Sequence, residues 1–152
     1  MSARLAEDFA RIEAAYASAL AHPLSSRKAL LVAVLIENFA DQAFEALRHS
    51  APERVYAAED VLAFRRLLLQ EAPALGLLSE LGSGRADAPR LETRSVEVPI
   101  ADYPGLPVAD YMVSLYNRNT VPRVLIVGPD GGARPAHEVL GEALAFWRER
   151  LG

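Results

Sequence analysis

The chain of 152 residues contains no cysteine, and Lys28 is its only lysine. The absence of cysteine excludes disulfide bonds, thiolate metal ligands, cysteine nucleophiles and dithiol redox cycles. We therefore predict that the protein has no disulfide reductase or isomerase activity.

A basic surface and long apolar segments are lacking as well. The formal net charge is −4, and a pair such as Arg65-Arg66 is too small to form a phosphate-binding surface, which argues against general nucleic-acid binding. The apolar run 29–36 is much shorter than the roughly 20 residues of a membrane span, and the N-terminal segment carries charges throughout. We expect a soluble cytoplasmic protein without a membrane contact.

Motifs for cofactors, metals and catalysis are also missing. The Gly-Pro-Asp-Gly-Gly segment at 128–132 has neither the spacing of a dinucleotide-binding loop nor the Lys-Ser/Thr of a phosphate loop. His22, His49 and His137 are scattered, without the spacing of a metal site on a helix. We expect no cofactor, no metal and no catalytic residue, so the sequence favours binding over catalysis.

The length fits a single domain, residues 1–152, and apolar periodicity predicts its elements. A helix begins after Ser2 and ends by Pro23. The later elements are a helix at 57–72, a loop at 74–91, a strand at 93–100, a helix at 108–117 burying Met112 and Leu115, a strand at 122–128, a short strand near 133–138 and a helix at 140–151 with the stripe Leu140, Leu144, Trp147 and Leu151.

Residues 28–49 allow two interpretations. Either 29–36 is a central strand buried on both faces and 39–49 is a helix, or 28–49 is one buried helix. Asn38 is a good N-cap for a helix that starts at Phe39, so we favour the strand followed by the helix.

With that strand, the order of elements resembles the thioredoxin-like superfamily. The segment 115–132, LYNRNTVPRVLIVGPDGG, is similar to the family segment in which a short helix, a hydrophobic-Pro dipeptide, an apolar strand and an acidic-Gly turn follow one another. The resemblance implies an α/β fold of three layers with a central mixed sheet, an extra N-terminal helix and an insertion at 57–91. It also implies a cis bond between Val121 and Pro122.

The same resemblance implies a redox-inactive member, because Asn38-Phe39-Ala40-Asp41 stands where thioredoxins carry Cys-x-x-Cys. If 29–36 and 122–128 were neighbouring strands, a groove would form in which Phe39 is partly exposed. An extended peptide would bind there by strand addition at the backbone of Val121. The candidate binding residues are Asn38, Phe39, Asp41, Asn117, Arg118, Val121 and Pro122.

These features favour a non-catalytic thioredoxin-like module that binds a protein or peptide, such as an assembly factor or adaptor. One alternative is a small-molecule binder or enzyme that uses Asp and Tyr groups in a pocket between 74–91 and the sheet. Another is a structural α+β oligomer, for example a homodimer associated through the Ala-rich first helix.

Overall fold

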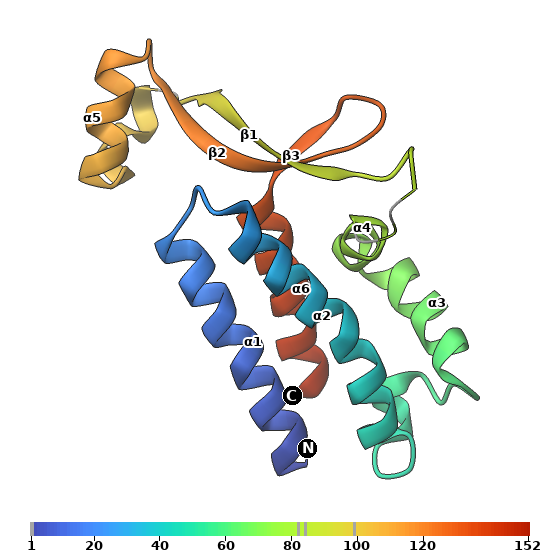
Figure 1. Ribbon diagram of the computed structural model, residues 1–152. Coiled ribbons are helices and arrows are strands. Elements are labelled where there is room, and N and C mark those ends of the chain that lie inside the picture. The colour runs from blue at the N-terminus through green and yellow to red at the C-terminus, as the bar shows by residue number, and fades with distance from the viewer. Residues whose placement is uncertain (1, 82, 84, 99) are drawn as a thin grey trace.

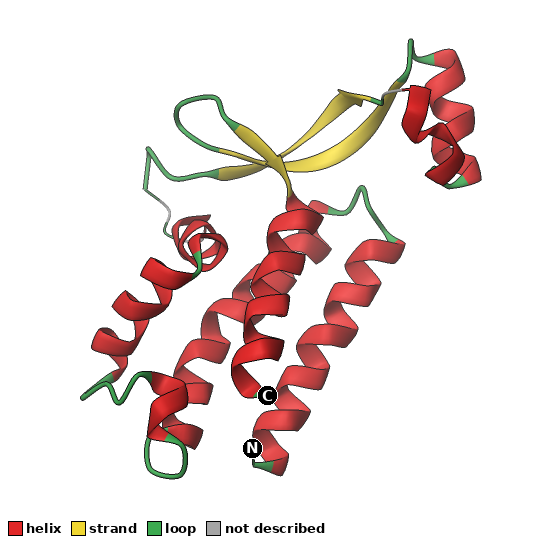
Figure 2. Cartoon of the chain, turned by 180° about the vertical axis from the view of Figure 1, so that it is seen from behind, coloured by secondary structure: helices red, strands yellow, loops and turns green. Residues whose placement is uncertain are grey.

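The computed structural model describes residues 2–81, 83, 85–98 and 100–152 and shows a mixed α/β protein (Figures 1 and 2). Helices lie below a small sheet, and one helix stands apart at the end of the sheet. The elements are α1 (Ala3–Ala21), α2 (Ser26–Leu47), α3 (Val61–Glu71), α4 (Pro73–Leu81), β1 (Arg90–Glu97), α5 (Val108–Tyr116), β2 (Thr120–Val127), β3 (Ala133–Pro135) and α6 (Ala136–Leu151), with short 3-10 helices at Pro52–Val55 and Ile100–Gly105.

Side-chain caps fix where several helices begin. The side chains of Ser2, Ser25 and Asp60 each accept a hydrogen bond from the backbone N–H three residues further on, at 3.2, 3.2 and 2.8 Å. Each cap satisfies one N–H that has no partner inside its helix. The predicted first helix is confirmed, whereas the predicted helix at 57–72 begins later, after the Asp60 cap.

Residues 29–36 are helical, so the favoured interpretation as a strand is wrong and the alternative of one long helix is right. Asn38 lies inside α2 and caps no helix. The strand prediction was wrong because the run is apolar on both sides of the helix. The inward side chains are Ala29, Val32, Ala33 and Ile36, and the exposed ones are Leu30, Leu31 and Val34.

The predicted loop at 74–91 contains α4, so that prediction is wrong for its first part. Pro73 occupies the first position of a helix, where its missing N–H has no cost, and does not simply end the preceding one. Ala74, Leu75 and Leu78 then turn into the core.

The sheet has the order β1-β2-β3, and both pairings among the described residues are antiparallel. The mixed sheet expected to contain 29–36 is therefore wrong. The long helices cover one face of the sheet (Figure 1), where Val124 and Ile126 join the core. The predicted strand at 93–100 is displaced to Arg90–Glu97, and Pro99 lies outside the described residues.

Pro122 is the third residue of β2, and the Val121–Pro122 bond is trans, so the predicted cis bond is wrong. β3 pairs only with Leu125–Val127, which leaves β2 without a strand neighbour on that side at Pro122. A proline, which has no N–H, is tolerated at such an edge.

Aromatic side chains fill the centre of the helical layer. The ring of Phe39 packs edge-on against Trp147 with centroids 5.0 Å apart, and Phe9 packs against Phe39 at 5.4 Å. Phe44 stacks on Phe64 at 5.7 Å. The predicted stripe of the last helix is confirmed as core, although α6 begins at Ala136.

Candidate functional site

Helix α5 exposes nearly all of its apolar side chains. Val108 and Tyr116 are 79% and 82% exposed, and Tyr111, Met112, Val113 and Leu115 are exposed as well. Among the described side chains of α5 only Ser114 is buried, so the predicted burial of Met112 and Leu115 is wrong. We call residues 100–119, which carry α5 at the end of the β1–β2 hairpin, the α5 arm (Figure 1).

One ion pair joins α5 to the sheet. A terminal N–H group of Arg123 in β2 donates to Asp110 Oδ2 at 2.9 Å, and the other terminal nitrogen donates to the carbonyl of Pro122 at 2.9 Å. Both charged side chains are only 20% exposed. The pair fixes the first turn of α5 against β2 while the rest of the helix extends into solvent.

Two consecutive residues in the left-handed conformation join α5 to β2. Arg118 has φ +55° and Asn119 has φ +63°. Asparagine adopts this conformation readily, whereas for arginine it costs about 1 kcal/mol. The N–H of Asn119 donates to the carbonyl of Ser114 at 2.9 Å, and the N–H of Val98 donates to the carbonyl of Asn119 at 2.7 Å. These bonds hold the end of the arm in a defined turn.

Three of the predicted site residues, Asn117, Arg118 and Pro122, border one hollow on the arm. Val121 lies beside Pro122 along β2, but its side chain is buried and its backbone is opposite Val96 of β1. The full lining is Ser95, Val113, Tyr116, Asn117, Arg118, Thr120 and Pro122.

The remaining predicted residues, Asn38, Phe39 and Asp41, lie in the second half of α2. Phe39 is 0% exposed, so its predicted partial exposure is wrong. The expected groove required 29–36 to be a strand beside β2. The structure instead places the two halves of the predicted site in different parts of the fold, the second half of α2 and the region where α5 joins β2.

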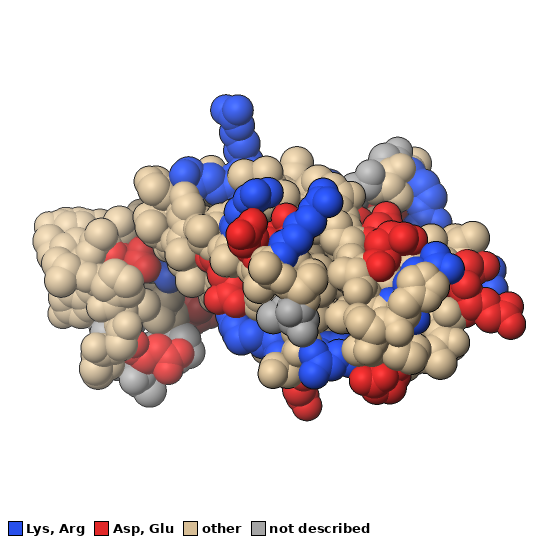
Figure 3. Space-filling view, turned by 90° about the horizontal axis from the view of Figure 1, so that it is seen from below, with Lys and Arg blue, Asp and Glu red and all other residues tan. Residues whose placement is uncertain are grey.

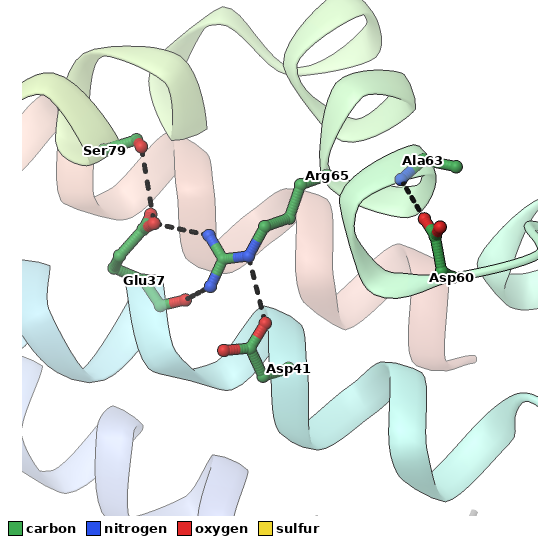
Figure 4. A network of polar contacts seen from close by, with 6 residues as sticks. All are labelled: Glu37, Asp41, Asp60, Ala63, Arg65 and Ser79. Carbon is green, nitrogen blue, oxygen red and sulfur yellow. Dashed lines mark hydrogen bonds and ion pairs between the residues drawn. The ribbon is translucent and has the colours of Figure 1, made fainter.

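Asp41 has a different partner, Arg65 of α3 (Figure 4). Arg65 Nε donates to Asp41 Oδ1 at 3.0 Å, while the two terminal nitrogens donate to the side chain and the carbonyl oxygen of Glu37, the latter at 3.0 Å. Ser79 of α4 donates to the same Glu37 carboxylate at 3.3 Å. The network therefore joins α2, α3 and α4.

Sequence analysis missed this network, although a signal was present. Glu37 and Asp41 are acids spaced i,i+4 on one helix, which is unfavourable unless a cation lies between them. Burial lowers the pKa of Arg65, but its hydrogen bonds to Asp41 and Glu37 outweigh burial and raise it overall. Arg65 is thus held as a cation between the two carboxylates.

A second polar cluster, also missed, lies at the end of α6. The hydroxyl of Tyr56 donates to Glu71 at 2.7 Å, and the guanidinium of Arg150 lies 3.7 Å from the centre of the Tyr56 ring. The pKa of Tyr56 is raised to about 12. Burial is the largest cause, and the hydrogen bond to Glu71 is the second. Arg150 also donates to the carbonyl of Arg54 at 2.7 Å, which ties the 3-10 helix Pro52–Val55 to α6.

Exposed apolar side chains gather at several places, two of which bear on association. The end of the molecule that carries α5, at the left of Figures 1 and 3, shows few charged atoms. The second place is the outer side of α2, where Leu30, Leu31 and Val34 are exposed on consecutive turns; we call these three residues the α2 stripe. The stripe follows directly after the exposed Leu24 of the α1–α2 loop.

A cavity of about 210 Å³ lies at the base of the α5 arm, between α1, α2, α6 and β2. Pro107 and Asp110 at the start of α5 line it, whereas a pocket was expected beside the segment 74–91, whose helix α4 lies at the other end of the sheet (Figure 1). Its lining residues are Tyr16, Ala19, Leu20, Pro23, Ser25, Ala29, Pro107, Asp110, Arg123, Val124, Ala136, His137 and Leu140.

Within the described ranges, no group of three or more metal-ligating side chains could hold an ion. The helices described there also include none with the length and apolar character to cross a membrane. Lys28 Nζ donates to Ser18 Oγ at 2.8 Å, a contact that joins α2 to α1. No family model, curated protein or solved structure matches the chain.

Proposed function

We propose that the chain is a non-catalytic protein-binding module, and that its α5 arm docks on a second copy of the chain. The observation that carries this proposal is the exposure of apolar side chains on every side of α5 except the one with Asp110 and Ser114. A helix that is apolar all round is normally buried. A cluster of exposed apolar side chains of this kind is typical of an interaction site rather than of a solvated surface.

A second copy offers a matching surface in the α2 stripe. α5 has nine residues and is therefore about 14 Å long, which suits the exposed stretch from Leu24 to Val34 at the start of α2. In a two-fold dimer each α5 would cover the stripe of its partner, so both apolar surfaces would be buried at once. Burying two contacts at once matters because a standard interface buries roughly 800 Å² per partner, more than one short helix supplies.

Helix docking fits the arm better than strand addition at Val121, because that side chain is buried and its backbone already faces β1. The first helix is a weaker interface than α5, since its exposed face carries mainly alanines and charged side chains such as Glu7 and Arg11. Membership of the thioredoxin-like superfamily, its three-layer arrangement and a cytoplasmic location stay predictions. The α5 arm would bind a partner whether or not the chain belongs to that superfamily.

The test is the oligomeric state measured by size-exclusion chromatography with light scattering. We expect a dimer for the wild type and monomers for Leu115→Glu in α5 and Leu31→Glu in the α2 stripe. Burying an unpaired carboxylate should weaken association by at least about 100-fold. Leu62→Glu is the matched control: Leu62 is exposed on α3, and that variant should remain a dimer.

Mixing the two monomeric variants identifies the contact. If α5 docks on the α2 stripe, a mixed dimer keeps one undamaged contact, formed by the α5 of the Leu31→Glu chain and the stripe of the Leu115→Glu chain. The mixture should then form dimers that neither variant forms alone. A Leu31→Glu variant that remains a dimer would instead indicate α5 packed on α5. A monomeric wild type at high micromolar concentration, or a mixture that stays monomeric, would overturn the proposal.

A further inference from the structure

The cavity at the base of the α5 arm has mainly apolar walls. Apolar side chains from four elements and two loops surround it, and its volume is about 210 Å³. An apolar cavity of about 150 Å³ is large enough for a benzene molecule. This cavity therefore has room for one aromatic ring and a small substituent.

The polar groups of the cavity gather around Arg123 and Asp110. Arg123 has five N–H donors, of which the contacts to Asp110 and to the carbonyl of Pro122 use two. Asp110 is already paired with this guanidinium. The cavity is therefore better suited to a ligand with hydrogen-bond acceptors than to a cation.

The helices add a neutral phenol and a helix N-terminus to the lining. The hydroxyl of Tyr16 donates to the carbonyl of His137 at 3.0 Å, and burial raises the pKa of Tyr16 while Arg148 opposes the rise, so the phenol stays neutral. His137 lies in the first turn of α6, and the positive end of that helix dipole favours an anion beside Arg123.

We propose that this cavity binds a small aromatic carboxylate, with the ring among the apolar side chains and the carboxylate on Arg123. Arginine binds carboxylates through parallel N–H donors, and the hydrogen bond to Asp110 would keep the guanidinium oriented. The site is independent of the proposed dimer, because it needs no residue of a second copy.

The probes are benzoate and, as its uncharged counterpart, toluene. Binding is followed by amide chemical-shift changes in two-dimensional NMR of the wild type and of the Leu115→Glu variant, whose substitution lies outside the cavity lining. We expect benzoate to bind both proteins with a Kd of about 1 mM or tighter. Binding to both, with or without a dimer, separates this inference from the proposed function.

Two variants test the location and the charge. Ala19→Leu fills the cavity and should weaken both probes at least about 10-fold, whereas Ala17→Leu, exposed on the same helix, should not. Arg123→Met should weaken benzoate at least about 10-fold and change toluene little, with Arg134→Met as its control.

Each remaining outcome overturns the inference. Absence of saturable shifts with benzoate, or benzoate binding that Ala19→Leu does not weaken, would show that the cavity is not the site. Binding of toluene but not benzoate would show that the site does not bind a carboxylate.

Discussion

Helices α5 and α6 both carry large apolar side chains, but those of α6 are buried and those of α5 are exposed to solvent. α6 is amphipathic, and Leu140, Leu144 and Trp147 are buried on its inner side. α5 is apolar on nearly all sides, and its large side chains are exposed. The comparison teaches that a one-sided apolar pattern indicates burial within the chain, whereas the apolar side chains of α5 stay exposed in the monomer, which is the basis of the docking role proposed for it.

The largest expected effect tests the buried side of this comparison. Phe39→Ala removes a fully buried ring that packs on Phe9 and Trp147, so it should lower the free energy of unfolding by about 3–5 kcal/mol. Tyr116→Ala removes an aromatic ring from α5 and should change the same quantity by no more than about 0.5 kcal/mol. Urea unfolding at a concentration where all proteins are monomeric measures both.

A similar loss for the two variants would break the comparison. It would mean that α5 contributes to the stability of the folded monomer as much as the core does. The proposed role of the arm as a docking element would then lose its basis.

An intermediate effect is expected from the network that joins α2, α3 and α4. Arg65→Ala leaves the carboxylates of Glu37 and Asp41 facing each other without a cation, and it should destabilise the protein by about 1–2 kcal/mol. Arg66→Ala alters an exposed neighbour on the same helix and should have little effect. Thermal unfolding of the two variants measures the difference. Equal melting temperatures would contradict the predicted role of Arg65.

The smallest effect is a pH dependence at Tyr56. Its pKa is raised from 10.0 to about 12, so between these values the folded chain keeps a proton that the unfolded chain loses. The resulting stability is fully present below pH 10 and is lost as the pH rises through 12. Because the hydrogen bond between Tyr56 and Glu71 is exposed to solvent, screening should limit the loss to about 1 kcal/mol or less.

The Tyr56→Phe variant separates this term from other alkaline effects. Urea unfolding at pH 9 and at about pH 11.5 should show a smaller loss of stability for Tyr56→Phe than for the wild type. Absorbance titration of tyrosinate should lose its latest component in the same variant. An unchanged titration would show that Tyr56 ionises normally.

Local pattern was enough to predict the presence and type of several elements. The helix after Ser2, the stripe of α6 and the approximate bounds of α5 and β2 all followed from periodicity and caps. The run 29–36 failed for a physical reason: with apolar side chains on both sides, a helix and a doubly buried strand give the same local signal. If the α2 stripe is an interface, the exposed residues that made 29–36 resemble a strand are the ones that bind the second copy.

The candidate site was predictable only in part. Asn117, Arg118 and Pro122 are neighbours because they follow one another around the turn after α5. The link to Phe39 depended on a strand pairing that does not exist, and the partners of Asp41 and Tyr56 come from distant segments. Contacts between Asp41 and Arg65, or between Tyr56 and Arg150, are set by tertiary packing, which a single sequence does not contain.

The place of α6 in the core has a consequence for synthesis on the ribosome. α6 follows all the other elements in sequence, yet its Trp147 contacts Phe39 of α2 and Phe64 of α3. While α1 to α4 emerge, they can pair as local hairpins, but the aromatic rings between them remain uncovered until α6 has been translated. We expect the nascent chain to close its core late and in one step, and to depend on chaperone protection until then.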